Sequence, residues 1–440
     1  MRIRIRKNQG HTRFYILLSL LLLLICVRYA LQVDIPRVIY LLVILLIAIC
    51  GDRSEIVAMC LCCIPLHESV DFFYAVVICM AVYLLKYRRE IRINLVFLAI
   101  VSMVFWELLH FLGQTFEIMG FLTDVIPLLA LLVFVSADTS KTDYGFVARV
   151  VAVTTAVLCV TLLLRVLFLA RFNLLAALAG IQRLGMDATT SNRSAELSGG
   201  ELNPNTLGII CILATTPLMQ LRTVGRGRKA DMMLSVILLV FGALTSSRTY
   251  LVCLAMMVLL LLFSQKGSLN QKLRFLGIII LLIILALLVL NFAFPDLLRY
   301  YYSRFFEEDI TTGRIGLMGT YHEFIVSNTN VLAFGIGLHD LAPKVMNVYR
   351  LAIVAPHNFI QEIIIAWGLP GLVMFAAMLL MMILRSRQFC RRQSLLHYIP
   401  LLIILFKSMA GQLLDSYYTM LALCYAYLSL TQNFWAEKRQ

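Results

Sequence analysis

The chain has 440 residues, of which 61% are hydrophobic and only 14% are charged. This balance excludes a soluble globular domain, and no ten-residue stretches of alternating polarity point to a β-barrel. The net charge of +14 does not indicate nucleic-acid binding, because the basic residues lie in short clusters between apolar segments rather than along a surface stripe.

Apolar segments follow one another along the chain, and most are long enough to cross about 30 Å of hydrocarbon at about 1.5 Å per residue. The third segment, 56–66, is short for a span, so we expect an all-α polytopic bundle of about 12–14 transmembrane helices. The first segment, 14–31, follows a basic N-terminus, and no small-residue cleavage site follows it. We therefore expect a retained first helix rather than a cleaved signal peptide. The eleven cysteines show no metal-ligand spacing and are expected to be free. The segments are 14–31, 36–50, 56–66, 71–85, 94–112, 120–136, 146–170, 205–221, 232–246, 249–264, 274–293, 357–384, 395–410 and 416–432.

The basic clusters predict how these spans are oriented, because Lys- and Arg-rich loops stay on the cytoplasmic side. Alternate counting from a cytoplasmic N-terminus places every cluster on that side and both termini in the cytoplasm. The same count places two long loops, 171–204 and 294–356, on the outer face. We treat 1–440 as a single integral membrane domain, whose large outer loop ends before the span starting at 357. The clusters are 2–7, 86–90, 222–229, 266–274, 385–392 and 437–440.

Within the second outer loop, residues 314–328 have a helical pattern. The sequence predicts a helix here that lies at the outer interface or packs on the bundle, with Thr311 or Thr312 as its cap. Gly335 and Gly337 in "FGIGLHD" predict a turn that returns the chain to the bundle. The predicted apolar face of the helix comprises Ile315, Met318, His322, Phe324, Ile325 and Val326.

Three residues fall on the outer face by this count: Arg248 at a tight turn, Arg314 at the start of the loop helix, and His357 at the start of a span. Two guanidinium groups suit a pyrophosphate, because each presents a planar fork of donors, and helix N-termini add positive charge. Histidine titrates near neutral pH and can accept a hydroxyl proton. Taken alone, each of these three residues has an ordinary role at the membrane–water interface. Together they favour glycosyl transfer from a lipid-linked donor, and no Asp-x-Asp pair on the outer loops demands a metal.

The motifs around these residues resemble successive motifs of the O-antigen ligase and O-antigen polymerase superfamily. They are "ELNPNTLG", "LTSSRTYLV", "TTGRIGLMGTYHEFIVSNTNVLAFGIGLHD" and "APHNFIQEIIIAWGLPGLV", over roughly residues 200–372. The resemblance implies a bundle that takes glycan from undecaprenyl pyrophosphate on the outer face of the bacterial inner membrane. It also implies an inverting, metal-independent reaction without cofactors. By resemblance, Arg248 and Arg314 bind the pyrophosphate and His357 activates the acceptor hydroxyl.

Four further residues are candidates for supporting roles. Asn358 and Gln361 lie near His357 on the same predicted helix, so their position, rather than the resemblance, suggests that they orient it. Asn203 and Asn205 belong to the first of the quoted motifs. The expected partners are the undecaprenyl-pyrophosphate-linked donor, the glycan acceptor, the lipid bilayer and a chain-length regulator protein.

Polymerase and ligase share this chemistry and differ in their acceptor. We favour a polymerase of capsular, O-antigen or exopolysaccharide repeat units, with a ligase that transfers glycan to a lipid A core as the alternative. A glycolipid flippase or transporter is a second alternative, and it predicts charged residues inside the spans. Few are found: Glu107, His110, Arg165 and Lys407. Glu107 and His110 are one helical turn apart and are expected to pair.

Overall fold

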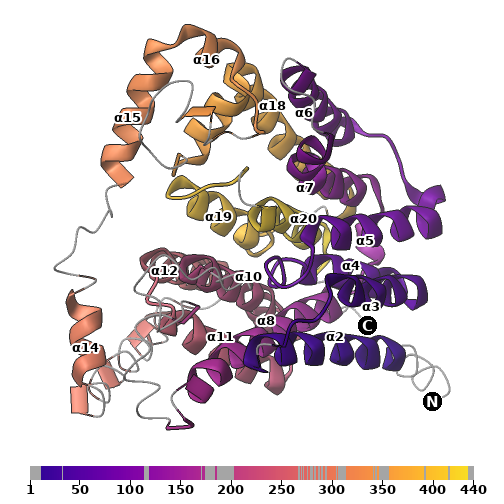
Figure 1. Ribbon diagram of the computed structural model, residues 1–440. Coiled ribbons are helices and arrows are strands. Elements are labelled where there is room, and N and C mark those ends of the chain that lie inside the picture. The colour runs from indigo at the N-terminus through magenta and orange to yellow at the C-terminus, as the bar shows by residue number, and fades with distance from the viewer. Residues whose placement is uncertain are drawn as a thin grey trace.

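The computed structural model describes most of the chain (Figure 1). The described residues form α-helices and short 3-10 turns and contain no strand, so the predicted all-α polytopic fold is confirmed. The described ranges are 11–31, 33–112, 118–169, 171–173, 184–185, 203–265, 314–339, 356–390, 393–414 and 417–434, with scattered residues in 268–305 and 341–345. Most of the first predicted outer loop and part of the second lie outside these residues, including Glu201, Thr311 and Thr312.

The helices follow the predicted segments closely. The predicted segment 274–293 is described only in part. The helices are α2 (Thr12–Leu31), α3 (Arg37–Cys50), α4 (Arg53–Cys62), α5 (Phe72–Tyr87), α6 (Leu95–Leu112), α7 (Ile118–Ser136), α8 (Tyr144–Leu169), α10 (Pro204–Thr223), α11 (Lys229–Leu244), α12 (Arg248–Ser264), α14 (Pro295–Tyr302), α15 (Arg314–Ser327), α16 (Thr329–Phe334), α18 (Phe359–Phe389), α19 (Leu395–Met409) and α20 (Tyr417–Thr431), with 3-10 turns η1 (Arg88–Glu90) and η2 (Thr139–Lys141).

Six of the described helices, α2, α6, α7, α8, α10 and α18, are long and apolar enough to cross a membrane by length and composition. Three more, α3, α12 and α19, are apolar but shorter. The short third segment is α4, and every one of its residues is buried. A helix that is enclosed on all sides reads as a uniformly apolar run, which is why its sequence looked like a span. All eleven cysteines are free, as expected, and nine of them are buried.

The bundle has two opposite ends, and we call the one that holds the described basic clusters, 86–90, 222–229 and 385–390, the basic end. There His11 binds Glu55, which joins the starts of α2 and α4, and Arg53 binds Glu90 in η1. Arg385 donates to the carbonyl of the last turn of α7, so the end of α18 lies here too. Both described chain ends lie on this side, away from α14 and α15 (Figure 1). Which side of the membrane the basic end faces stays a prediction.

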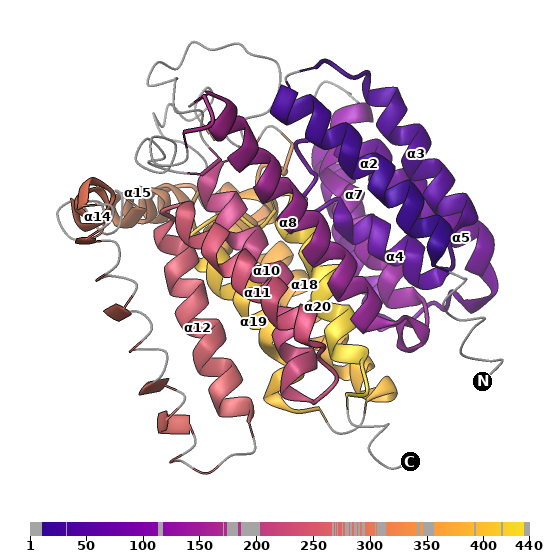
Figure 2. The same cartoon turned by 90° about the horizontal axis from the view of Figure 1, so that it is seen from below.

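The opposite end, which we call the site end, holds α15, α16 and the starts of α10, α12 and α20. Viewed from below, α8, α10, α11 and α12 lie side by side, and α2 to α5 form the flank beyond α8 (Figure 2). The predicted loop helix is confirmed as α15, but its packed face differs from the expected one. Tyr321, Phe324 and Ile325 are buried, whereas Ile315 and Val326 are exposed.

The predicted segment 357–384 corresponds to α18, but this helix is not continuous, because it is broken at Gly368. This glycine has a φ of 70° and divides α18 into a half-helix, 359–367, and a long helix, 369–389. A Cβ at Gly368 would lie 2.7 Å from the backbone nitrogen of Phe334, so the close approach of α16 requires glycine here. Pro370 follows and cannot donate to the preceding turn.

The predicted glycine turn after α16 is confirmed, and it closes the end of the half-helix. Gly335 and Gly337 have φ angles of 82° and 83°, in the left-handed region that favours glycine. The N–H of Gly337 donates to the carbonyl of Ala366 at 2.8 Å. A Cβ at Gly335 would lie 2.4 Å from that same carbonyl oxygen, so the two chain segments touch through their backbones.

A buried carboxylate holds this glycine turn in place. Glu107 in α6 is fully buried and accepts hydrogen bonds from the N–H of Leu338 at 2.9 Å and from Nε1 of Trp367 at 2.6 Å. The expected pairing of Glu107 with His110 is therefore wrong: His110 instead contacts the carbonyl oxygen of Phe334 at 2.8 Å. Both residues serve as structural ties between α6 and the site end, which accounts for two of the charged residues inside the spans.

Candidate functional site

Arg314 lies where three helices meet. It is the first residue of α15, and its Nη1 donates to the carbonyl of Ala410 at 2.8 Å and to Oγ1 of Thr249 at 3.4 Å. Ala410 follows α19, and Thr249 is in the first turn of α12. The side chain is half-buried, and its pKa is lowered by burial and then by the positive charge of Arg248. Because Thr249 directly follows Arg248 in the chain, both arginines lie at the start of α12.

Arg248 begins α12 directly after a strained turn. Ser247 caps the helix, because its side chain accepts from the N–H of Tyr250 at 3.2 Å. Ser246 has a φ of 50°, a conformation that costs a non-glycine residue of the order of 1 kcal/mol. The hydroxyl of Thr245 donates to the carbonyl of Gly242, which satisfies a polar group in this buried turn. The predicted tight turn is therefore present, and it presents Arg248 at the N-terminus of a helix.

His357 precedes the half-helix instead of forming part of its first turn, which corrects the expected helix start. Asn358 is the cap, and its Oδ1 accepts from the N–H groups of Ile360 at 3.0 Å and Gln361 at 3.3 Å. Its Nδ2 donates to the carbonyl of Met409 at 3.3 Å. Asn358 therefore fixes the backbone next to His357, and its supporting role in the site stays a prediction.

The environment of His357 favours a neutral imidazole. The side chain is half-buried, and its pKa is lowered by burial first and then by the positive charges of Arg314 and Lys407. A histidine that is neutral near pH 7 can accept a proton. Arg314 contacts Thr249 in α12, and Gln361 of the half-helix contacts Met318 in α15, so α12, α15 and α18 converge at the site end.

Gln361 connects helices within this site. Its Nε2 donates to the carbonyl of Met318 at 2.8 Å, and this bond ties the half-helix to α15. Met318 lies one turn after Arg314 in α15, and Gln361 lies in the first turn of the half-helix that follows His357. The bond therefore sets the distance between α15, which carries Arg314, and the start of the half-helix next to His357. Gln361 thus supports the site through α15 rather than through a hydrogen bond to the imidazole.

The two asparagines of the first motif lie at the start of α10. Asn203 caps this helix by accepting from the N–H of Asn205 at 2.9 Å. Four residues into α10, a Cβ at Gly208 would lie 2.9 Å from Oγ1 of Thr245 and 3.4 Å from Cβ of Ser247. The start of α10 therefore packs against the turn that leads into Arg248, which places Asn203 and Asn205 at the site end.

A short turn after α19, residues 409–414, is the part of the site that the sequence did not indicate. Arg314 and Asn358 bind the carbonyls of its first two residues, as described above. Glu362 is fully buried and accepts from the N–H groups of Leu413 at 2.7 Å and Leu414 at 3.1 Å. Lys407 donates to the carbonyl of Gln412 at 2.8 Å. The sequence signal that could have indicated this turn is a pair of charged residues, Glu362 and Lys407, which lie inside or next to apolar runs.

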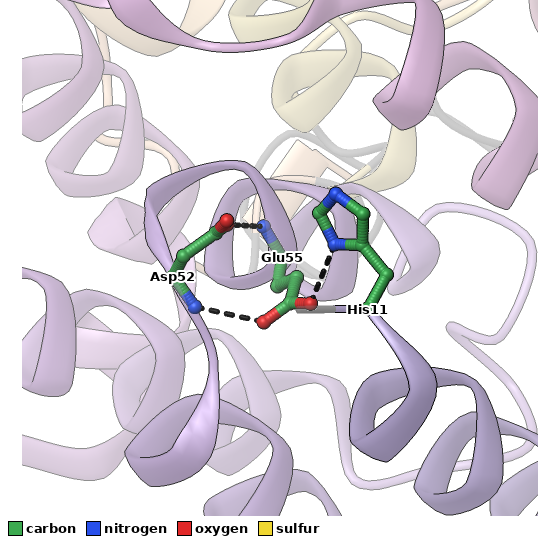
Figure 3. A group of neighbouring side chains, drawn as sticks. All are labelled: His11, Asp52 and Glu55. Carbon is green, nitrogen blue, oxygen red and sulfur yellow. Dashed lines mark hydrogen bonds and ion pairs between the residues drawn. The ribbon is translucent and has the colours of Figure 1, made fainter. Parts of the chain in front are cut away.

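One cluster at the basic end has the residue types of a metal site. His11, Asp52 and Glu55 place their ligand atoms within 4.8 Å of one another (Figure 3). However, Glu55 already uses both oxygens: one contacts Nδ1 of His11 at 2.7 Å, and the other accepts from the N–H of Asp52 at 2.8 Å. Asp52 in turn caps α4 by accepting from the N–H of Glu55 at 3.0 Å. The cluster is thus a capping box joined to the start of α2, remote from the site end.

Comparison with models of known protein families gives no match, and a search of curated proteins finds no relative.

Proposed function

We propose that the protein is a membrane glycosyltransferase that polymerises undecaprenyl-pyrophosphate-linked oligosaccharide repeat units of a capsule, O-antigen or exopolysaccharide. The observation that carries the proposal is the convergence of Arg248, Arg314 and His357 at one end of the bundle, from three helices that are far apart in the sequence. The motif resemblance over roughly residues 200–372 indicates the chemical identity of the donor, a glycan linked to undecaprenyl pyrophosphate. In this proposal the site end is the outer face of the bacterial cytoplasmic membrane, and both termini are cytoplasmic.

The proposed reaction uses each group for one task. Arg248 and Arg314 bind the pyrophosphate of the donor, because forked guanidinium groups match phosphate oxygens. A hydroxyl oxygen of the acceptor glycan attacks the anomeric carbon and forms the new C–O bond. The bond from that carbon to the pyrophosphate oxygen breaks, and undecaprenyl pyrophosphate leaves with the electron pair. His357 accepts the hydroxyl proton, and the anomeric configuration inverts.

The electrostatics of the site agree with this assignment. Charge grows on the leaving pyrophosphate during the reaction, and fixed cations stabilise it without reorganisation. The lowered pKa of His357 keeps the imidazole neutral for its role as base. The N-termini of α12, α15 and the half-helix add partial positive charge to the same region. Grooves between the helices would hold the polyprenyl tails.

The ligase alternative differs from this proposal in its acceptor, and the transporter alternative involves no glycosyl transfer. A ligase would use the same three residues and transfer the glycan to a lipid A core. A flippase or transporter needs charged residues along a pathway, yet Glu107 and His110 bind backbone groups of the site end. The site contacts therefore favour glycosyl transfer over transport.

Reconstitution tests the proposal. The purified protein is incubated in liposomes with the polyprenyl-pyrophosphate repeat unit, in EDTA, beside the His357→Ala variant. We expect a ladder of lengthening glycans from the wild type and none from the variant. A repeat unit that merely crosses the membrane would replace the proposal with a transporter. If a product forms only after a lipid A core acceptor is added, the protein is the ligase.

A further inference from the structure

The turn between α10 and α11 at the basic end, residues 222–229, has one well-defined shape. The N–H of Gly225 donates to the carbonyl of Arg222 at 2.9 Å, and the N–H of Arg226 donates to the carbonyl of Leu221 at 2.8 Å. Gly225 has a φ of 77°, in the left-handed region that favours glycine. These bonds satisfy the last carbonyls of α10, so the end of this helix is capped by the turn itself.

The 222–229 turn also folds back closely on its own first residue. A Cβ at Gly227 would lie 2.8 Å from Cα of Arg222, an approach that only glycine allows. Because Gly227 lies between Arg226 and Arg228, the backbone of both is held next to that of Arg222. The buried side chain of Gln220 fixes the base of the turn by donating to a backbone carbonyl of α19 at 2.5 Å. Several cations therefore start from one compact and anchored piece of backbone.

Three of these cations point into solvent. The side chains of Arg222, Arg228 and Lys229 are exposed, and those of Arg222 and Lys229 make no hydrogen bond or ion pair with any residue that the structure describes. Asp231, the acidic residue that follows the turn, is buried and already bound: the Arg149 fork donates to its two oxygens at 2.9 and 3.1 Å. Arg149 thus neutralises Asp231, and the turn presents a positive surface.

An apolar surface continues directly from the cations along α11. Lys229, Met233, Val236 and Val240 follow one another at helical spacing and therefore lie on one face of this helix. The three apolar side chains are 67%, 50% and 55% exposed, respectively. They belong to the predicted span 232–246, so this face is expected to contact lipid. A positive turn at the end of a lipid-facing stripe has the layout of a phospholipid, with its charge at the surface and its chains below.

We propose that the 222–229 turn and this face of α11 bind one anionic phospholipid. Its phosphate lies at Arg222, Arg228 and Lys229, because forked guanidinium groups match phosphate oxygens, and an acyl chain lies along the stripe that starts at Met233. Anionic lipids attract basic residues next to a membrane span. A zwitterionic lipid carries its own cation next to the phosphate, so it gains less from the positive turn. A soluble anion would gain nothing from the stripe.

A lipid bound here would act on the site end through two helices. Both α10 and α11 run from the 222–229 turn to the site end, where Gly208 packs against the turn that leads into Arg248. The lipid would hold the two helices at one depth in the membrane and with them the start of α12. This inference goes beyond the proposed function and does not rest on it, because lipid binding is measured without any glycan.

The experiment measures lipid binding by native mass spectrometry of the full-length protein in a non-ionic detergent. Dioleoyl phosphatidylglycerol is titrated, dioleoyl phosphatidylcholine is the zwitterionic control, and glycerol 3-phosphate tests a phosphate without chains. One variant combines Arg222→Gln, Arg228→Gln and Lys229→Gln. A second, Gly227→Ala, keeps every charge but adds a Cβ that pushes Arg222 out of position. The dissociation constant of the first bound lipid is compared among the proteins.

The matched control is a second triple variant, Arg88→Gln, Arg89→Gln and Arg92→Gln. It removes the same number of exposed arginine or lysine charges from the same end of the bundle, in and next to η1. A general attraction between a positive protein and an anionic lipid would be weakened equally in both triple variants. A built site would be weakened only in the variant of the 222–229 turn.

We expect the wild type to prefer phosphatidylglycerol over phosphatidylcholine. The triple variant of the turn should bind phosphatidylglycerol roughly 10- to 100-fold more weakly, as for the loss of several basic residues near an anionic lipid. Gly227→Ala should also bind more weakly, whereas the control variant should bind as the wild type does. Phosphatidylglycerol should raise the unfolding temperature of the wild type more than that of the triple variant of the turn, because the lipid binds the folded state.

Several results would overturn the inference. Equal affinity for the two lipids, or equal weakening in both triple variants, would mean that no anionic lipid site exists at the turn. Glycerol 3-phosphate that binds as tightly as the lipid would make this a site for a soluble anion. Unchanged binding by folded Gly227→Ala would show that only diffuse charge matters. A lipid-free triple variant of the turn that unfolds well below the wild type would assign these side chains to the fold instead of to a lipid.

Discussion

Glu362 accepts a hydrogen bond from the backbone N–H of Leu413 at 2.7 Å, although the two residues are 51 positions apart. This contact joins the first turn of the half-helix to the turn after α19. The base candidate His357 precedes the half-helix, and Arg314 contacts the turn. The contact therefore helps to set the geometry between the proposed base and the proposed pyrophosphate ligands, and the predictions below test that geometry.

The first prediction concerns the pH dependence of His357. A base must be neutral, so activity falls as the pH drops through its pKa. Because burial and the charges of Arg314 and Lys407 lower that pKa from its ordinary value of about 6.5, the acid limb of kcat/KM should lie below pH 6.5. Lys407→Met removes one of these charges and should move the limb to higher pH. His357→Ala should lower the rate by roughly 10²–10⁴-fold above the acid limb and should abolish the limb itself. An acid limb above pH 6.5, or one that persists unchanged in His357→Ala, would contradict the assignment.

The second prediction concerns the fork of Arg314. Arg314→Lys keeps the charge but has a single nitrogen in place of the planar fork, in which Nη1 binds Ala410 and Thr249 and the other nitrogens are left for a phosphate. We therefore expect a roughly 10- to 100-fold loss of activity. The matched control is Arg226→Lys, which changes an arginine at the basic end whose contact with the carbonyl of Asn433 is long and exposed. Both variants are assayed by glycan ladder formation. Near-normal activity of Arg314→Lys would argue against a guanidinium clamp.

The third prediction concerns stability and Glu107. Glu107→Gln replaces one of the two carboxylate oxygens with an NH2 group. The remaining oxygen can still accept from Leu338 and Trp367, but the NH2 group then faces the N–H of His339, which leaves a donor at the buried carboxylate site without its acceptor. We expect the free energy of unfolding to fall by about 1–3 kcal/mol. Glu90→Gln removes the charge of a partly exposed carboxylate that binds Arg53 but keeps an oxygen that can accept from it, so it should cost less than about 1 kcal/mol. Thermal unfolding in detergent measures both, and equal losses would show that Glu107 does not hold the site end together.

The fourth prediction concerns which end faces outward. In a Cys50→Ser background, which removes the exposed cysteine, single cysteines replace Ser327 in α15 and Arg89 in η1; both positions are exposed. A membrane-impermeant maleimide should label Ser327→Cys in spheroplasts and Arg89→Cys only after lysis, because basic loops stay in the cytoplasm. The reverse pattern would invert the topology and place the proposed site on the cytoplasmic face.

Much of the fold follows from the sequence, because its signals are local. Apolar run lengths and basic clusters predict the succession of helices and bring the clusters 86–90 and 222–229 to the same end. The glycines at 335 and 337 predict a turn, since their φ angles favour residues without a Cβ. For the same reason, Arg248, Arg314 and His357 could be assigned to one end from the alternation of spans alone.

The tertiary structure decided what depends on contacts between distant segments. The run from Ile363 to Leu384 has no charged residue, so its break at Gly368 became visible only through the approach of α16. Glu107 and His110 are neighbours on one helix, yet each binds a backbone group more than 200 positions away. Buried polar groups take whichever partner the packing brings within reach, because leaving one unsatisfied is costly. The sequence by itself determined the spans and the end on which the candidate residues lie. Only folding determined that the 409–414 turn and Lys407 join them, because a hydrogen bond depends on distance in space and not on separation along the chain.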